Sequence, residues 1–363
     1  MTKILDSPPA FASAEGRGND NLVICGALAY DRIMDFPGKF SDHILAGKTH
    51  MLNLSFTVNG VKESFGGTGG NIAYNLALLG ERPKIVAVAG RDFAKYAVWL
   101  KKNKIDISGV KIVKDELTAS AYIMTDRADN QLTAFYPGPS ASSGRGAKTP
   151  LAPPSAYPSG ILGTGPGQAL ARGENAKCNP PNPLCQGGII AIIAPDLVAR
   201  MREYAKIFKQ FKIPYIFDPG QQITEYNARE LKFGLSGAKM LVGNDYEIEL
   251  ILKKLGLKLK QLAKLTEILV ITKGRQGSEI YCQGRKIVIP PAKAKAVLDP
   301  TGAGDGYRAG FIKGLTMGWP LRKCGRLAGL VAVYTVEKPG TQTHRFSWRE
   351  LGKRYRDNYG ESL

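Results

Sequence analysis

The chain has no run of about 20 apolar residues, which is the length a helix needs to cross a membrane. Residues 1–20 also lack the continuous apolar stretch of a secretory signal, and they carry Pro, Ala, Ser, Gly and mixed charges instead. We expect these residues to form a disordered tail. The sequence therefore predicts a cytoplasmic protein that does not bind membranes.

Cysteine is scarce and scattered. The five cysteines are Cys25, Cys178, Cys185, Cys282 and Cys324, and this odd, dispersed set does not indicate a disulfide framework. It fits a reducing compartment. Cys178 and Cys185 lie close together in the sequence, but they have neither a C-x-x-C spacing nor a nearby histidine pair, so a metal site there is not favoured.

Histidine is rarer still, and two common catalytic motifs are missing. None of the three histidines, His43, His50 and His344, lies beside a G-x-S-x-G elbow, so a hydrolase triad has little support. The G-x-x-x-x-G-K-[ST] pattern is also absent, which excludes a P-loop ATPase.

Acidic residues are few compared with basic ones. The 50 Lys and Arg residues against 31 Asp and Glu give a formal net charge of +19, which raises the possibility of nucleic-acid binding. The basic residues are spread along the chain, however, and the cluster 253–264 follows an amphipathic helical pattern typical of a solvated face. Polyphosphate ligands would suit this charge equally well. A non-catalytic, basic nucleic-acid-binding module remains a distant alternative.

Residues 137–187 lack a periodic apolar pattern. They are dense in Pro, Gly, Ser and Ala, and they are too long for an ordinary connection within a compact domain. We expect a disordered or loosely ordered insertion.

The rest of the chain alternates between strand and helix patterns. Apolar strand runs occur at 22–27, 84–89, 188–194, 215–218, 239–242 and 268–272, with helical patterns at 93–102, 196–211 and 228–236. This alternation predicts an α/β fold with a mainly parallel sheet covered on both faces. Tyr30 and Asp31 fall in the loop after the first strand, at the edge where such sheets bind ligands, so Asp31 is a site candidate. A helix or turn cap is the alternative role for Asp31.

Two segments show hairpin patterns. Residues 51–58 alternate in polarity and are followed by Asn59-Gly60, a strong hairpin turn signal, and then by 61–65. This predicts a small antiparallel flap at 49–65. Residues 119–125 and 131–136 are separated by a polar turn and predict a second hairpin.

The stretch 299–310 predicts the central site. The pattern predicts a strand, a glycine turn and the start of a helix. The small residues Gly302, Ala303 and Gly304 would let a ligand approach the backbone N–H groups closely, and such groups attract anions. Asp305 lies in or beside the first helical turn. An ordinary capped helix is the alternative interpretation.

Two further motifs precede it. Gly66-Gly67-Thr68-Gly69-Gly70-Asn71 opens a helix, but it follows a flap and not the first strand of a βαβ unit, so dinucleotide binding is not favoured. Asn244-x-x-Glu247 lies at a strand-to-helix junction, where an N-capped helix with an exposed Glu is the alternative.

Together and in this order, these motifs resemble the ribokinase-like (PfkB) family of carbohydrate and nucleoside kinases. The resemblance covers residues 21–346 except the insertion. The stretches 27–34, 218–222, 307–310 and 340–344 are similar to the prokaryotic adenosine or broader nucleoside kinases. The resemblance implies a mainly parallel three-layer α/β/α sandwich with a small β-sheet lid within 40–65, followed by a C-terminal helix at 347–363.

The resemblance also implies catalytic roles. Asp305 would be the general base that accepts the proton of the attacking hydroxyl, and Gly302, Ala303 and Gly304 would form an anion hole for the phosphoryl group in transit. Asn244 and Glu247 would hold Mg²⁺ through water. Asp299 and Thr301 resemble positions that bind a monovalent cation such as K⁺ in several relatives.

Ligand binding is implied at other positions. Asp31, Gly67 and Asn71 would bind the acceptor, with Asp31 and Asn71 on the vicinal hydroxyls of a ribose. Thr272 and Gly274 resemble the turn that carries ATP.

The activity implied is transfer of the γ-phosphate of ATP to the 5′-hydroxyl of a nucleoside, adenosine first. A sugar or sugar-phosphate kinase of the same family is the alternative, and a purine would need a stacking surface, for which Phe135 and Tyr136 are candidates. In relatives the lid excludes water and often forms a dimer contact, so a homodimer through the lid is a further expectation.

Overall fold

The computed structural model describes residues 22–43, 54–128, 130–139 and 189–363. The predicted N-terminal tail, residues 140–187 of the predicted insertion, Cys178 and Cys185 lie outside these ranges. None of the helices in the described ranges is both long and apolar enough to span a bilayer.

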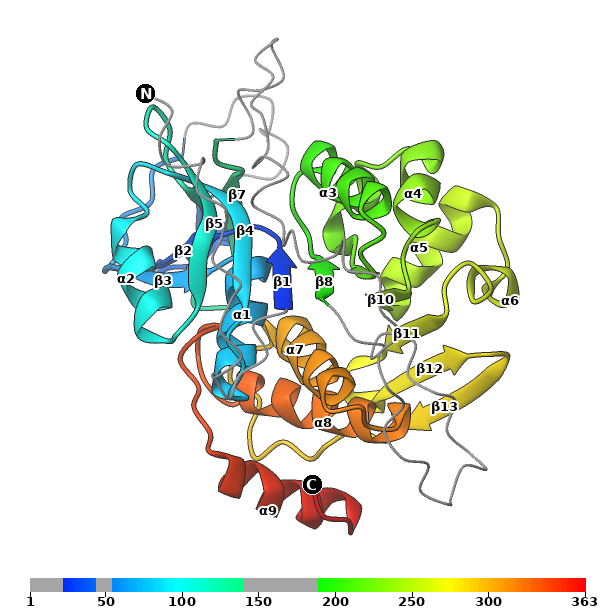
Figure 1. Ribbon diagram of the computed structural model, residues 1–363. Coiled ribbons are helices and arrows are strands. Elements are labelled where there is room, and N and C mark those ends of the chain that lie inside the picture. The colour runs from blue at the N-terminus through cyan, green and yellow to red at the C-terminus, as the bar shows by residue number, and fades with distance from the viewer. Residues whose placement is uncertain (1–21, 44–53, 129, 140–188) are drawn as a thin grey trace.

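The centre of the molecule is a nine-stranded sheet (Figure 1). Its strands run in the order β13 (Arg285–Ile289), β12 (Ser278–Cys282), β11 (Ile268–Thr272), β10 (Met240–Asn244), β9 (Tyr215–Phe217), β8 (Ile190–Ile193), β1 (Leu22–Cys25), β4 (Lys84–Gly90) and β5 (Asp106–Val113). All neighbours pair in parallel except β11 with β12 and β12 with β13. The predicted mainly parallel sheet is confirmed, whereas β5 was not predicted.

Alternation along each strand sends side chains to two separate cores. In β1, Leu22 and Ile24 belong to one buried cluster, while Val23 and Cys25 belong to the other. The first cluster is completed by helices α1 (Thr68–Leu78), α2 (Ala94–Lys102), α7 (Ala303–Thr316), α8 (Leu321–Val336) and α9 (Trp348–Tyr359), and the second by α3 (Val198–Gln210), α4 (Ala228–Leu235), α5 (Asp245–Leu255) and α6 (Leu259–Leu262). Helices therefore cover both faces, and the predicted α/β/α sandwich is confirmed.

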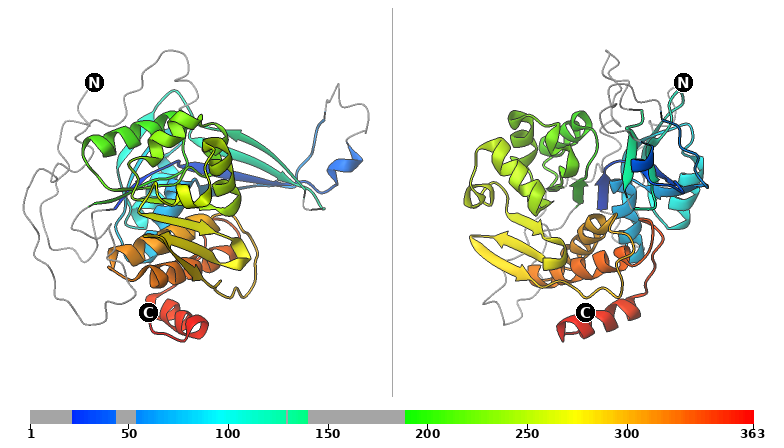
Figure 2. Two further views of the ribbon diagram at one scale, coloured as in Figure 1. Left: turned by 90° about the vertical axis from the view of Figure 1, so that its right-hand side faces the viewer. Right: turned by 180° about the vertical axis from the view of Figure 1, so that it is seen from behind.

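A second sheet has four strands in the order β3 (Val61–Gly66), β2 (Ala29–Asp35), β6 (Ala119–Thr125) and β7 (Gln131–Tyr136). Figure 2 shows that it extends away from the α/β body. We call these four strands the lid sheet. The predicted location of Tyr30 and Asp31 in a loop is wrong, because both lie within β2, where Asp31 pairs with Ser64 on one side and Ala121 on the other.

The predicted flap hairpin is also wrong in its pairing. Residues 54–58 do not form a strand, and residues 49–53 lie outside the described ranges. The backbone N–H of Asn59 instead donates to the carbonyl of Asp35 at 3.1 Å, at the end where β2 and β3 pair antiparallel. The backbone groups of β3 are thus satisfied by β2, a strand that the sequence did not reveal. The predicted hairpin of β6 with β7 is confirmed.

A buried ion pair joins Glu81, three residues after the end of α1, to Lys313 in the last turn of α7. Glu81 and Lys313 are 5% and 9% exposed, and Lys313 Nζ lies 2.5 Å from Glu81 Oε1. We expect Glu81→Gln to lower the free energy of unfolding by about 3 kcal/mol, because it leaves a mostly buried ammonium without its charge partner. Urea unfolding curves measure this change.

Glu361→Gln is the matched control, since it breaks the pair of Arg326 with a side chain that is 58% exposed. An exposed pair of this kind contributes less than about 1 kcal/mol. Equal losses in the two variants would show that burial does not strengthen the Glu81 pair.

Candidate active site

A cavity of about 490 Å³ collects most of the predicted site residues. Its lining includes Asp31, Gly67, Asn71, Glu247, Thr301, Gly302, Gly304 and Asp305. The volume lies in the range of pockets that enclose small organic ligands. Asn244, Ala303, Thr272, Gly274 and Asp299 are not among the residues that line this cavity.

The glycine turn at 302 sets the start of α7. Gly302 is the N-cap residue with φ 77°, a left-handed conformation that a residue with a side chain adopts only with strain. Asp305 lies in the first turn and is 7% exposed. Its carboxylate does not cap the helix, because Oδ2 instead accepts a hydrogen bond from Asn71 Nδ2 at 2.9 Å.

The ionisation of Asp305 reflects opposing influences. Burial raises the pKa of this carboxyl, while the charge of Arg308 and the hydrogen bond from Asn71 oppose the rise. The net shift is upward, so Asp305 binds a proton more readily than a solvated aspartate. A raised pKa is the change that suits a general base near neutral pH.

Asn71 is held in place by a buried hydrogen-bond chain. Its Oδ1 accepts from Gln342 Nε2 at 3.0 Å, and Gln342 Oε1 accepts from Trp99 Nε1 at 3.0 Å. The same Gln342 nitrogen also donates to Tyr96 Oη at 2.6 Å. The amide of Asn71 therefore has one orientation, with its nitrogen directed at Asp305.

Gly67 connects β3 of the lid sheet to α1, the helix that carries Asn71. Its φ is 83°, and a Cβ there would lie 2.5 Å from the carbonyl oxygen of Ala27. Both the conformation and the close backbone contact require glycine.

Asp31 faces the same space from the lid sheet. Burial raises its pKa to about 6, and the negative charges of Asp299 and Asp305 add to the rise. A side chain at Gly66 would overlap the Asp31 carboxylate, so this glycine provides the room for it. Ionised carboxylates only accept hydrogen bonds, and the pair Asp31 and Asp305 therefore suits a ligand that presents hydroxyl donors.

Asn244 and Glu247 form a reciprocal capping box at the start of α5. Asn244 Oδ1 accepts from the Glu247 N–H at 2.7 Å, and Glu247 Oε2 accepts from the Asn244 N–H at 2.8 Å. Glu247 Oε1 makes no hydrogen bond to a described residue, and Glu247 lines the cavity. Thr272 pairs with Asn244 at the ends of adjacent strands, and Gly274 follows at φ 53°.

Asp299 and Thr301, the two residues predicted to hold a monovalent cation, lie in a loop that hydrogen bonds to the Asp299 carboxylate stabilise. Asp299 Oδ1 accepts from the Thr301 N–H at 2.9 Å, and Oδ2 accepts from the Gly340 N–H at 2.8 Å. Burial opposes ionisation here, but these hydrogen bonds lower the pKa of Asp299 overall. The described residues contain no group of three or more His, Cys, Asp or Glu side chains arranged to hold a metal.

The two aromatic candidates differ in position. Phe135 of β7 lines the cavity and is 58% exposed. Tyr136 is not part of the lining, and its hydroxyl lies 3.3 Å from Glu116 Oε2, to which it donates a hydrogen bond. Only Phe135 can therefore offer a stacking surface to a ligand near Asp31.

Sequence reasoning missed an ion pair at the wall of the cavity. Arg308 of α7 lines it, and Arg308 Nη2 donates to Asp218 Oδ1 at 2.7 Å across 90 residues of sequence. Burial raises the pKa of Asp218 to about 7 although Arg308 opposes the rise. A signal was present, because Arg308 is the one charged residue in an otherwise apolar and small stretch one turn after Asp305.

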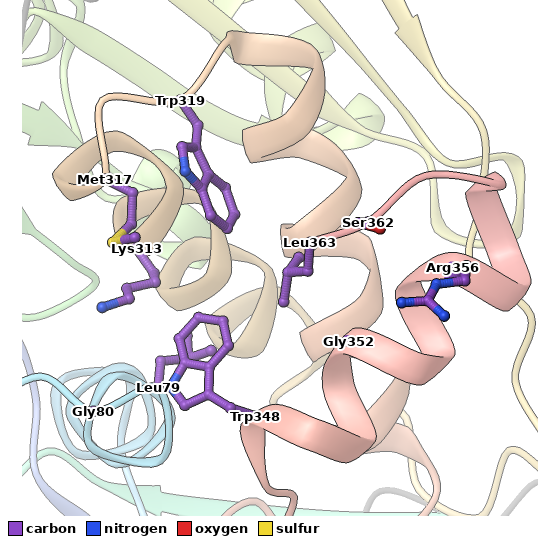
Figure 3. A pocket seen from close by; sticks show the side chains of 10 residues that line it. All are labelled: Leu79, Gly80, Lys313, Met317, Trp319, Trp348, Gly352, Arg356, Ser362 and Leu363. Carbon is purple, nitrogen blue, oxygen red and sulfur yellow. The ribbon is translucent and has the colours of Figure 1, made fainter.

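A second cavity, of about 610 Å³, lies at the opposite end of α7 (Figure 3). Lys313 of α7 and Met317, which caps the end of that helix, line it together with Trp348 of α9. It contains none of the predicted site residues. The smaller cavity at the start of α7 is therefore the candidate active site.

The site has the parts of a phosphotransferase. A buried carboxylate lies beside a glycine turn that opens a helix, and a second sheet contributes a further carboxylate to the same cavity. The chain belongs to the pfkB family of carbohydrate kinases, whose model matches residues 28–147 and 169–348. It is accordingly an ATP-dependent kinase with a hydroxyl group as acceptor.

Individual relatives share this architecture. A nucleoside kinase of Methanothermobacter thermautotrophicus is 32% identical over 85% of this chain and 90% of its own length. The nucleoside kinase of Burkholderia thailandensis in complex with inosine superposes with a TM-score of 0.73 at 29% identity, covering 94% of this chain and 100% of that one. Its complex with ADP and inosine gives a TM-score of 0.70 at 31% identity, over 94% and 97% of the two chains.

Proposed function

We propose that the chain transfers the γ-phosphate of ATP to the 5′-hydroxyl of a nucleoside, with adenosine as the first acceptor to test. The observation that carries this proposal is that Phe135 lines the same cavity as Asp31, Asn71 and Asp305. An aromatic face suits a nucleobase, whereas the carboxylates and the amide suit the hydroxyls of a ribose. The nucleoside kinases among the similar chains support the same acceptor class.

The proposed roles follow from the geometry of the site. Asp305 accepts the proton of the acceptor hydroxyl while the new oxygen–phosphorus bond forms and the bond between the γ-phosphorus and ADP breaks. Asn71 holds the Asp305 carboxylate in position. The N–H groups of Gly302 and Gly304, which line the cavity, stabilise the negative charge of the phosphoryl group, each such donor contributing about 3 kcal/mol. The predicted third donor differs, because the Ala303 N–H donates to the carbonyl of Pro300 at 3.2 Å.

The residues present fit the predicted cations. Mg²⁺ prefers one or two carboxylates together with water, and Glu247 lines the cavity with one oxygen, Oε1, that has no hydrogen bond to a described residue. When bound, the ion would neutralise the charge of the phosphates. We also propose that Asp299 and Thr301, whose loop adjoins Gly302, bind a monovalent cation. Thr272 and Gly274 form the proposed ATP-binding turn.

We propose that the lid sheet covers the acceptor and forms a homodimer contact. Several large apolar side chains of this sheet are exposed, namely Val61, Tyr122, Leu132 and Phe135. Burial of such a surface is favourable, and an uncovered sheet is prone to unspecific association. Phe135 would serve both as part of the acceptor site and at the border of the contact.

A substrate panel tests the function directly. ADP release is measured with ATP and each of adenosine, inosine, guanosine, cytidine, ribose and fructose 6-phosphate. We expect kcat/KM for at least one purine nucleoside to exceed that for ribose by 100-fold or more, on the order of what two or three lost ligand contacts contribute. Higher kcat/KM with ribose or fructose 6-phosphate would make the chain a sugar kinase.

Phe135→Ala provides a control within the site. We expect it to raise KM for the nucleoside and to leave KM for ribose nearly unchanged, since ribose has no aromatic base to stack on Phe135. Thr133→Ala, on the same strand and exposed but outside the cavity lining, should change neither.

A further inference from the structure

Arg308 occupies an unusual place beside the glycine turn. It lies one helical turn after Asp305, and its side chain is 11% exposed. A Cβ atom built on Gly304 would overlap Arg308 Nη1, so this nitrogen lies directly over the glycine predicted to form the anion hole. The guanidinium and the N–H groups of the turn therefore border the same part of the cavity.

The guanidinium is held from one side only. Nε and Nη2 face the carboxylate of Asp218, which is 0% exposed. Nη1 makes no hydrogen bond to any residue in the described part of the chain. When a carboxylate binds one edge of a planar guanidinium, the remaining N–H groups point in a fixed direction. Arginine side chains bind phosphate in this geometry.

Arg308 lies among acidic groups, and one of its nitrogens remains without a hydrogen bond within the described part of the chain. Asp218, Asp305 and Glu247 all act on Arg308 electrostatically. Asp218 alone makes the close ion pair, which offsets the cost of burying the guanidinium. The donor capacity of Nη1 is left for a ligand.

We propose that Arg308 is a catalytic residue whose Nη1 donates a hydrogen bond to the phosphoryl group in transit, and that Asp218 positions its guanidinium. The inference rests on the proposed function, because it assigns a further contact to the same phosphate-transfer site. The negative charge that spreads over the phosphoryl oxygens during transfer is the charge that an arginine stabilises.

Two other roles for Arg308 would give different results. In the first, the charge of Arg308 acts only on Asp305 and keeps this base ionised. In the second, the ion pair of Arg308 with Asp218 only stabilises the fold. In the first case, loss of Arg308 would shift the pH profile and leave the plateau rate unchanged. In the second case, a comparably buried pair elsewhere would give the same phenotype.

The test compares Arg308→Gln, Arg308→Lys and Arg308→Ala with Arg354→Gln. Arg354 and Glu337 form a pair whose side chains are 10% and 13% exposed, and neither residue lines the cavity. For each variant, kcat and KM are measured from pH 5 to 9 with ATP and the best acceptor of the panel, and the midpoint of urea unfolding is measured in parallel. Arg308→Ala is also assayed with added guanidinium at concentrations that leave the fold intact.

We expect Arg308→Gln to lower kcat by about 10²- to 10³-fold at every pH, with KM for the acceptor within a few-fold. Arg308→Lys keeps a positive charge near Asp218, but its single nitrogen cannot pair with Asp218 and reach the phosphoryl group in the planar guanidinium geometry, so its kcat should fall at least about 10-fold. This variant carries the test if the Gln variant does not fold. Added guanidinium should restore part of the rate of Arg308→Ala.

The inference is overturned if the plateau kcat of Arg308→Gln lies within about threefold of the parent enzyme, or if Arg354→Gln loses as much activity as Arg308→Gln at equal stability. Absence of rescue together with a normal rate in Arg308→Lys would overturn it as well. If the parent enzyme phosphorylates none of the panel acceptors, the proposed function itself has failed, which is a separate outcome.

Discussion

Asp305→Asn is expected to lower kcat by at least about 10²-fold while KM for ATP stays within a few-fold. The amide keeps the shape of the side chain and can still accept a hydrogen bond from Asn71 Nδ2, but it cannot take the proton of the acceptor hydroxyl. Because folding raises the pKa of Asp305, the parent kcat should fall as the pH drops through that raised pKa and the base becomes protonated. Steady-state ADP release across pH measures both effects.

The matched control is Asp245→Asn, an equal change in the first turn of a different helix. Asp245 begins α5 and is exposed, outside the cavity lining. Its kcat should match that of the parent. Retention of more than about a tenth of the activity in Asp305→Asn would contradict the role of general base, since such a base contributes roughly 10²- to 10⁴-fold.

The second large effect concerns the acceptor. Asp31→Ala should raise KM for the nucleoside about 10- to 100-fold, because ribose hydroxyls would be left without acceptors in a closed site, and it should change KM for ATP little. The pKa of Asp31 is raised to about 6, so in the parent enzyme KM for the acceptor should rise as the pH falls below about 6 and Asp31 gains a proton. That pH dependence of KM should be absent in the variant.

Asp35→Ala is the control on the same strand, since Asp35 is exposed at the end of β2 and is not part of the cavity. It should leave both KM values unchanged. If Asp31→Ala raises the two KM values equally, Asp31 supports the fold and does not bind the acceptor.

The sequence predicted the main sheet well because the signal there is local. Each buried parallel strand is a short apolar run, and each following helix has its own apolar stripe. The turn at Gly302 is an exception, because the strand predicted before it does not form: no strand lies between β13 and α7, where every residue is described, and Val297 and Leu298 of the apolar run are 50% and 62% exposed. The lid sheet was harder to predict from the sequence. The strand β2 has a mixed burial pattern and pairs in parallel with β6, about 90 residues away, so neither its existence nor its partners follow from nearby residues.

The residues of the candidate site were likewise predictable where the signal is local and not where it depends on long-range contacts. Asp305 and the glycine turn before it were predictable because these residues are contiguous in the sequence. The same holds for the glycine-rich motif 66–71 that ends in Asn71. The hydrogen bond between Asn71 and Asp305 spans 234 residues, and the bond between Arg308 and Asp218 spans 90, so the fold alone brings these pairs together. The capping box of Asn244 and Glu247 shows a different limit, since the same two residues cap the start of a helix while Glu247 also lines the cavity.

The division of the cavity between the two sheets also bears on how new substrates can arise. Asp31 and Phe135 belong to the lid sheet, whereas Asp305 and its glycine turn belong to a helix packed on the central sheet. Substitutions in the lid sheet can therefore alter which alcohol is accepted without moving the groups that handle phosphate. Because of this separation, acceptor specificity can evolve independently of phosphate transfer. If the lid sheet of another kinase is grafted onto this chain, we expect the acceptor to change and Asp305 to keep its role as base.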